Sequence, residues 1–305
     1  MKKMLFIFNP TAGRGRLKAR LFDIVNTFVK YGFKVQVYPT QEKGDATTFL
    51  MNDQDQYDLI LCAGGDGTLN EVVSGMLHSG KSSPIGLIPA GSMNDVGHSF
   101  KISHDIMKAA KAVLTGKPYL MDIGKLNGKY FIYVAAFGVF TNISYTTSQK
   151  QKNAIGNLAY YLEGIKQLSE LRPRHIRVEY GDKVIEEDFL VGLVSNSLYI
   201  AGFKNFNSNL ISLNDGLLEM LLIKMPKNPV ELQQIINSLI NYKINKNLMY
   251  YIQTPQVTIS SPEKLEWTLD GEFGGIYDRV EIENYNKAIR IISNAFKGDK
   301  SEQKE

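Results

Sequence analysis

The sequence predicts an α/β protein of two domains: an N-terminal parallel sheet with crossover helices, followed by a C-terminal β-rich domain. Over residues 1–120, short apolar runs alternate with helical patterns, which is typical of a parallel sheet. Loops that contain glycine follow three of these runs. Beyond residue 120, short strand patterns separated by turns prevail, and a length of 305 residues agrees with two domains.

The predicted elements of the first domain, residues 1–120, alternate in type. The expected strands are 4–8, 33–38, 57–63 and 84–89, and the expected helices are 17–29, 45–51, 69–77 and 104–114. The loops 9–15, 64–68 and 91–95 each follow a strand. In an open α/β sheet the ligand crevice lies at the carboxyl ends of the strands, so these three loops should converge.

The loop 64–68, Gly-Gly-Asp-Gly-Thr, is the most informative stretch of this domain. Its glycines allow positive φ angles and close approach of the backbone to a ligand. The helix that follows aims free N–H groups and the positive end of its dipole at the same point, which favours phosphate. A carboxylate such as that of Asp66 is compatible with a neighbouring phosphate if Mg²⁺ bridges the two groups. The alternative is a strand-to-helix turn whose glycines only satisfy the backbone geometry.

The second domain is expected to cover residues 121–284. A hairpin is predicted at 119–125 and 129–136 around Asn127-Gly128, and a helix-like segment at 155–168. Further strands are predicted at 176–180, 189–195, 217–223, 256–260, 265–269, 280–283 and 288–292, with a helix at 229–244. Residues 285–295 are expected to return to the first domain, and residues 298–305 to form a frayed tail.

Composition restricts the class of protein. Apolar residues at 44% and charged residues at 22% are ordinary for a globular protein, and the net charge of +4 suits an anionic ligand or surface. A single cysteine excludes an internal disulfide framework. No apolar stretch approaches the ~20 residues of a membrane span, and the run 4–8 is too short for a signal peptide. We therefore expect a cytoplasmic protein that reaches a membrane only at its surface.

Four motifs in a fixed order carry a resemblance to a known family: Asn9-Pro10-x-x-Gly13, Gly64 to Glu71, Gly91-Ser92-x-Asn94-Asp95 and Leu269-Asp270-Gly271-Glu272. Together they resemble the diacylglycerol kinase catalytic domain family, in its soluble bacterial lipid-kinase branch (the B type). The resemblance runs from the first strand to about residue 292. It implies a nucleotide-binding domain similar to that of NAD kinases and phosphofructokinases, and a β-sandwich-like domain for the lipid. It also implies ATP-dependent, Mg²⁺-dependent phosphorylation of diacylglycerol to phosphatidic acid, with ATP held between the domains.

The same resemblance implies the site residues. The nucleotide-binding set is Asn9, Pro10, Thr11, Ala12, Gly13, Thr40, Gly65, Asp66, Gly67, Thr68, Leu69, Asn70, Glu71 and Ser92. The catalytic set is Asp66, Asp95, Asp122 and the general base Glu272, and the ligands of a structural Mg²⁺ are Ser212, Asp215 and Leu217. Two departures are visible: Ser92 stands where Thr is frequent, and Val96-Gly97-His98 replaces a run that ends in Arg.

Local explanations compete with several of these assignments. Isolated Asp residues in loops often cap helices or form turns, which applies to Asp66, Asp95 and Asp122. Asp-Gly-Glu at 270–272 is a common turn, and Asn-Asp-Gly at 214–216 is a strong type I′ hairpin signal.

The function also has alternatives. The acceptor could be another lipid alcohol, such as sphingosine or ceramide, or a soluble hydroxyl as in NAD kinases. A non-enzymatic lipid or nucleotide sensor is disfavoured by the intact Asp66 and Glu272. We expect a lipid substrate, transient association with the inner membrane surface as a peripheral protein, and no nucleic-acid partner. A homodimer is left open.

Overall fold

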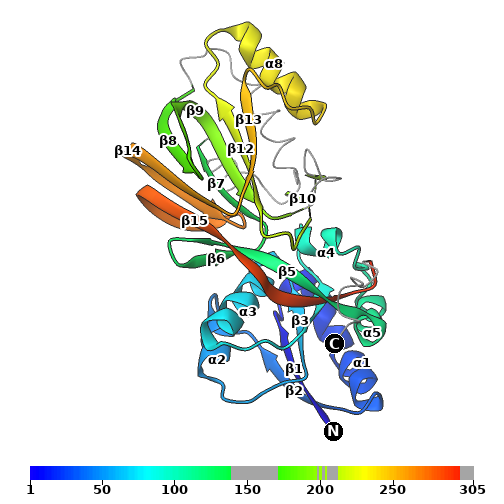
Figure 1. Cartoon of the computed structure of the whole chain (residues 1–305). Helices are drawn as coiled ribbons and strands as arrows, with labels where there is room; N and C mark the ends of the chain where they lie inside the picture. Colours follow the sequence, from blue (N-terminus) through cyan, green and yellow to red (C-terminus); the bar gives the residue numbers. More distant parts are fainter. Residues whose placement is uncertain (139–170, 198, 201–202, 205–211, 296–305) are drawn as a thin grey trace, which may run out of the picture. The chain divides into compact units, whose positions relative to one another are not determined.

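The computed structural model describes residues 1–138, 171–197, 199–200, 203–204 and 212–295 (Figure 1). The chain divides into two compact units: unit 1 holds Met1–Met121 and the chain from Lys287 onward, and unit 2 holds Asp122–Asn286. The predicted mixed α/β class is confirmed. The helix-like segment 155–168 and the tail 298–305 lie outside the described residues. No helix in the described ranges is long and apolar enough to cross a membrane.

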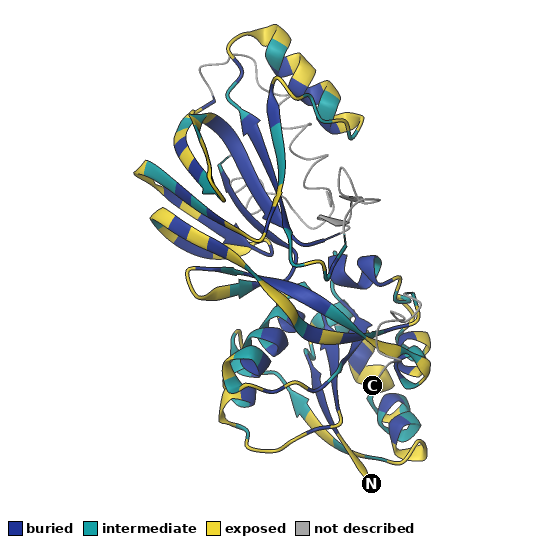
Figure 2. Ribbon diagram, viewed as in Figure 1, coloured by how far each residue is buried: buried dark blue, intermediate teal, exposed yellow. Residues whose placement is uncertain are grey.

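Unit 1 is built on a parallel sheet in the order β2-β1-β3-β4. The strands are β1 (Lys2–Phe8), β2 (Phe33–Pro39), β3 (Leu59–Gly64) and β4 (Ile85–Pro89). Every residue of β3 and β4 is buried, as the dark central strands of Figure 2 show. A parallel sheet is covered on both faces, and for that reason its strands appear in the sequence as unbroken apolar runs.

Helices cover the two faces of this sheet, with α1 and α5 on one side and α2 and α3 on the other (Figure 1). On α1, the buried residues Leu17, Ile24 and Phe28 recur at helical spacing and join the core that contains Met4 and Phe6 of β1. The helices are α1 (Arg16–Lys30), α2 (Asp45–Asn52), α3 (Asp66–Ser79), α4 (Asp95–Ser99) and α5 (Ile106–Thr115), and a 3₁₀ turn, η1, covers Ala12–Gly15. The short helix α4 was not predicted.

The register of the strands brings their carboxyl ends level. Phe8 at the end of β1 pairs with both Pro39 and Ala63, and Gly64 pairs with Pro89. The chain segments that leave β1, β2, β3 and β4 therefore start from one edge of the sheet.

Unit 2 is dominated by antiparallel strands, in the order β13-β12-β9-β7-β14-β15. Its strands are β5 (Lys117–Leu126), β6 (Lys129–Phe131), β7 (Val134–Gly138), β8 (Arg174–Tyr180), β9 (Lys183–Ser195), β10 (Tyr199–Ile200), β11 (Phe203–Lys204), β12 (Leu218–Lys224), β13 (Met249–Thr254), β14 (Gln256–Leu269) and β15 (Glu272–Ser293). The chain enters unit 2 within β5 and leaves it within β15.

Two long strands give unit 2 its form. Both β9 and β14 pair with β7 along one stretch and with β8 along another, so the sheet bends around a single apolar core. Phe137 and Trp267 lie in that core with ring centroids 5.0 Å apart. The hairpin of β14 and β15 alternates buried and exposed residues, which Figure 2 shows as alternating dark blue and yellow.

Several boundaries differ from the prediction. The strands expected at 256–260 and 265–269 form the single strand β14, with a shift of register between Ser260 and Leu265. The segments 280–283 and 288–292 both belong to β15, whose Ile291 pairs with Ile85 of β4. The helix expected to reach residue 244 is α8 (Pro229–Ile240), because Tyr242 turns to φ +52° and breaks it. The strands β10, β11 and β13 were not predicted.

Candidate functional site

The loop after β1 is a compact turn organised by Asn9. The Asn9 side-chain oxygen accepts hydrogen bonds from the backbone N–H of Thr11 (2.9 Å) and from the Thr11 hydroxyl (2.7 Å). Gly13 follows at φ +63°, and a Cβ there would lie 3.2 Å from the carbonyl oxygen of Ala90. The loop after β1 therefore packs closely against the chain that leaves β4, in a conformation that favours glycine.

The loop after β3 approaches the same segment even more closely. A Cβ on Gly91 would lie 2.4 Å from the Cα of Gly65, a distance that real Cβ atoms do not adopt. Helix α3 begins at Asp66, so its free N–H groups and the positive end of its dipole lie at this contact. The predicted convergence of the three glycine loops is confirmed, and together they form a suitable seat for an anion.

Asp66 and Asn94 connect two of these loops. The backbone N–H of Asn94 donates to Asp66 Oδ2 at 2.7 Å. Asn94 adopts the left-handed conformation, with φ 56°, and its side chain closes a ring with Gly91 through two hydrogen bonds of 2.9 Å. Asp66 therefore makes a structural contact in addition to any contact with a ligand. The next residue after Asn94, Asp95, is the first residue of α4 and is fully buried.

The other predicted nucleotide-binding residues differ in how they can act. The side chains of Thr68 and Leu69 are buried, so a ligand contact from these positions would use the backbone. Glu71 accepts hydrogen bonds from the backbone N–H of Gly44 (2.8 Å) and Ala46 (3.3 Å), so it caps the start of α2. Thr40 and Asn70 have half-buried side chains, and Ser92 has an exposed one.

In unit 2, Asp122 is fully buried and holds the loop 212–217. Its backbone N–H donates to the carbonyl oxygen of Leu213 at 2.8 Å, and its Oδ2 accepts the N–H of Gly216 at 2.7 Å. The same oxygen accepts the side-chain amide of Asn284 at 3.2 Å. A buried carboxylate needs hydrogen-bond donors, and these contacts supply two of them to Asp122.

The loop 212–217 contains the predicted magnesium ligands Ser212, Asp215 and Leu217. Their hydroxyl, carboxylate and carbonyl oxygens are hard donors of the kind that Mg²⁺ prefers. Asp215 is exposed, and one of its oxygens accepts the Leu217 N–H at 3.0 Å. Asn284 Oδ1, close to this loop, is buried without a hydrogen-bond partner in the described structure. The residues of the loop therefore fit a magnesium ion, although no group of three or more His, Cys, Asp or Glu side chains is placed to bind a metal among the residues described.

In the turn 270–272, hydrogen bonds of Asp270 form a fixed frame, and Glu272 is exposed at its end. The buried carboxylate of Asp270 accepts three backbone N–H groups, from Ile132 (2.8 Å), Tyr133 (3.0 Å) and Val134 (3.1 Å). The Tyr133 hydroxyl donates to the Asp270 carbonyl oxygen at 2.9 Å. Glu272 is exposed at the first residue of β15, so the frame holds it at the surface, as a general base that must meet an acceptor would require.

Sequence reasoning did not single out three polar side chains connected with Asp122: Asn196, Glu219 and Asn284. Asn196 donates to the Asp122 carbonyl oxygen at 2.7 Å. Glu219 is 2% exposed, and burial raises its pKa to about 7. The hydrogen bond from Gln253 opposes this increase in pKa, and the negative charges of Asp215 and Asp122 add to it. A Glu inside the apolar run 217–223 is the one sequence signal that could have drawn attention to Glu219, whereas Asn284 stands among polar neighbours and gave no such signal.

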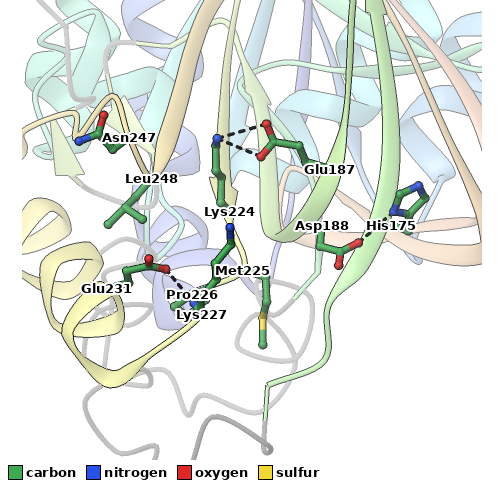
Figure 3. Close-up of a pocket in the computed structure, with 10 residues that line it drawn as sticks. All are labelled: His175, Glu187, Asp188, Lys224, Met225, Pro226, Lys227, Glu231, Asn247 and Leu248. Carbon is green, nitrogen blue, oxygen red and sulfur yellow. Dashed lines mark hydrogen bonds and ion pairs between the residues drawn. The ribbon is translucent and has the colours of Figure 1, made fainter.

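A pocket of about 690 Å³ in unit 2 lies beside the start of α8 and contains none of the predicted site residues (Figure 3). Two contacts between charged or titratable side chains lie in its wall: Lys224 contacts Glu187 at 2.9 Å, and the His175 ring contacts Asp188 at 2.9 Å. The pKa of His175 is raised by its hydrogen bonds to Asp188 and Glu186. Because Glu187 and Asp188 are occupied by these contacts, we assign the pocket no ligand.

The glycine loops at the carboxyl edge of the unit 1 sheet place the chain among α/β proteins that offer backbone N–H groups to an anion. The diacylglycerol kinase catalytic domain matches residues 3–126. A diacylglycerol kinase of Bacillus subtilis (strain 168) is 34% identical over 294 residues, which cover 96% of each chain. One from Staphylococcus carnosus is 36% identical over 276 residues, covering 90% of each chain. The chain therefore belongs to the diacylglycerol kinase family, whose members are lipid kinases.

Solved structures agree on the fold. A crystal structure of a diacylglycerol kinase from Bacillus anthracis has a TM-score of 0.75 at 24% identity and covers 96% of this chain and 97% of that chain. A second structure from the same organism has a TM-score of 0.83 with the same coverage.

Proposed function

We propose that this protein transfers the γ-phosphoryl group of ATP to diacylglycerol and releases phosphatidic acid and ADP, with Mg²⁺ as the metal ion. The observation that carries the nucleotide half is the contact of Gly65 with Gly91 at the start of α3, where no side chain can intervene. The acceptor follows from the relatives that are named diacylglycerol kinases.

In this proposal unit 1 is the nucleotide-binding domain. The backbone N–H groups at the start of α3 and the loop 9–13 bind the phosphates, and Thr40, Asn70 and Ser92 contribute polar side chains. Asp66 serves the Mg²⁺–ATP end of the reaction, and Asp95 belongs to the catalytic set. A divalent ion near Asp66 would supply neutralisation of the phosphate charge, without which a carboxylate beside phosphate is repulsive.

Unit 2 is the lipid-substrate domain, and Glu272 is the general base. Its carboxylate takes the proton of the acceptor hydroxyl as the hydroxyl oxygen forms a bond to the γ-phosphorus, and the bond to the oxygen that bridges the β- and γ-phosphates breaks. Asp122 keeps the loop 212–217 in place through Leu213 and Gly216, and Ser212, Asp215 and Leu217 would hold a second, structural Mg²⁺. The frame of Asp270 keeps Glu272 exposed to the acceptor.

A diacylglycerol substrate is resident in a membrane, so we also propose transient binding to the inner membrane surface. The net charge of +4 favours a surface that contains anionic lipid. Gel filtration with light scattering tests whether the chain forms a homodimer, which the sequence leaves open.

A panel of acceptors with labelled ATP tests the proposal. Diacylglycerol, sphingosine, ceramide and NAD are offered separately, with Glu272→Gln as the control for transfer that depends on the base. We expect label in phosphatidic acid alone. Preferential labelling of another acceptor would replace diacylglycerol as the substrate, and ATP hydrolysis without any labelled acceptor would contradict a kinase.

A further inference from the structure

Asn284 connects Asp122, which is predicted to be catalytic, with the loop 212–217, which is predicted to hold a structural Mg²⁺. Its side-chain nitrogen donates to Asp122 Oδ2 at 3.2 Å and to the Leu217 carbonyl oxygen at 3.1 Å. Its backbone N–H donates to the carbonyl oxygen of Pro255 at 2.8 Å, which fixes Asn284 on the hairpin of β14 and β15. One amide on a well-held strand thus contacts both a buried carboxylate and the end of the loop 212–217.

The loop is oriented by hydrogen bonds at several points. Asp122 holds it through Leu213 and Gly216, and the Leu217 N–H donates to Asp215 Oδ1 at 3.0 Å. The bond from Asn284 uses one acceptor position of the Leu217 carbonyl and fixes the direction of that group. A carbonyl group that a neighbouring residue already orients binds a cation more readily, because less reorganisation is needed when the ion binds.

The side-chain oxygen of Asn284 also indicates a cation site at this loop. Its oxygen is buried and accepts no hydrogen bond from the part of the chain that the structure describes, and the side-chain oxygen of Asn196, which also contacts Asp122, is in the same situation. Buried acceptors are normally satisfied by protein or by ordered water, so two of them beside a loop of oxygen donors indicate a site that is completed by water or by a hydrated ion.

We propose that Asn284 is a positioning residue for the magnesium loop: it orients the Leu217 carbonyl oxygen and the Asp122 carboxylate, and thereby sets the affinity of the loop for Mg²⁺. This inference rests on the metal assignment of Ser212, Asp215 and Leu217 made above. Residues that hydrogen-bond to metal ligands typically contribute roughly 10–100-fold to metal affinity or activity.

The test measures the melting temperature of the full chain against MgCl₂ concentration without nucleotide, so that only a protein site for the ion contributes. Asn284→Asp removes the donor and sets a carboxylate against Asp122, whereas Asn284→Ala removes the donor without adding charge. Asn241→Asp is the matched control, because the Asn241 amide also donates to a backbone carbonyl, that of Asn237, at 2.7 Å, but at an exposed helix end. Asp215→Asn reports on the metal loop itself.

We expect Mg²⁺ to raise the melting temperature of the wild type and of Asn241→Asp, and to have no effect on Asp215→Asn. Both Asn284 variants should need roughly 10–100-fold more Mg²⁺ for half of the rise. Asn284→Ala provides the result if Asn284→Asp does not fold, and Mn²⁺ binding followed by electron paramagnetic resonance on each folded variant gives a second measure. One outcome would contradict the role of Asn284 alone: Mg²⁺ raises the melting temperature of the wild type but not of Asp215→Asn, and folded Asn284 variants respond as the wild type does. The assignment of the magnesium loop would then remain valid. If neither the wild type nor Asp215→Asn responds, the metal loop is wrong, and the inference with it.

Discussion

Asn94 donates its backbone N–H to the carboxylate of Asp66 at 2.7 Å, and this bond ties the chain after β4 to the first turn of α3. Asp66 is thus both a loop contact and the residue that we assign to the Mg²⁺–ATP end of the reaction. The two roles can be separated, because the loop contact needs only an acceptor oxygen, whereas the metal role needs a negative charge.

Asp66→Asn keeps an acceptor for Asn94 and removes the charge. We expect the rate to fall by roughly 10²–10³-fold, the size of effect seen when one preorganised electrostatic group is lost, and higher Mg²⁺ to restore it partly at best. The measurement is the initial rate against Mg²⁺ concentration at fixed ATP and lipid, with a melting curve alongside. Full activity would exclude the metal role, and an unfolded variant would show that Asp66 acts as a loop contact.

Glu272→Gln should abolish most phosphotransfer while ATP affinity stays unchanged. Loss of a general base costs roughly 10²–10⁴-fold in rate, and an exposed Glu can be replaced with little effect on stability. We would measure kcat at saturating lipid and ATP binding by calorimetry, with Glu266→Gln on β14, which is also exposed, as the control. A near-normal kcat for Glu272→Gln would remove it from the mechanism.

Asp270→Asn should destabilise the protein. The carboxylate accepts the N–H groups of Ile132, Tyr133 and Val134, and an amide cannot satisfy all three with its single oxygen. We expect a loss of about 1–3 kcal/mol in the free energy of unfolding, since a buried N–H without an acceptor is left behind. Urea denaturation measures it, with the exposed Asp278→Asn on β15 as the control. Equal stability of the two variants would contradict the role of the frame.

Gly91→Ala should weaken nucleotide binding by forcing two loops apart. The new Cβ would lie 2.4 Å from the Cα of Gly65 and 2.9 Å from the side-chain oxygen of Asn94. Such overpacking typically costs about 1–3 kcal/mol, and the backbone must move to relieve it. ATP affinity and melting temperature are measured together, with the exposed neighbour Ser92→Ala as the control for stability. Unchanged ATP affinity in Gly91→Ala would show that the contact does not shape the nucleotide site.

Binding to membranes should depend on salt and on lipid charge. The chain has a net charge of +4, and attraction between exposed charges is screened as ionic strength rises. Co-sedimentation with vesicles should therefore fall as salt increases and should be weak on neutral vesicles. Equal binding to neutral and anionic vesicles at low salt would contradict an electrostatic attraction.

The sequence was sufficient for much of unit 1. Unbroken apolar runs predicted β1, β3 and β4, because strands of a parallel sheet are buried on both faces. The glycine loops could be placed at the carboxyl edge because every parallel strand ends there. Unit 2 was less predictable. Strand β13 was missed, and only Pro255 separates it from β14. Strand β14 was predicted as two strands, because the residues at its shift of register do not follow a strand pattern in the sequence.

The sequence by itself determined the mixed α/β class, the alternation of strands and helices in unit 1 and the four motifs that place the chain in its family. Only the tertiary structure decided which polar side chains contact one another. Asn284 bonds to Asp122 across 162 positions, and Asp270 bonds to Ile132 across 138. Local propensity and hydrophobic period describe a residue and its close neighbours along the chain. The partner of a buried amide or carboxylate depends instead on which distant strands and loops lie side by side once the apolar core has formed.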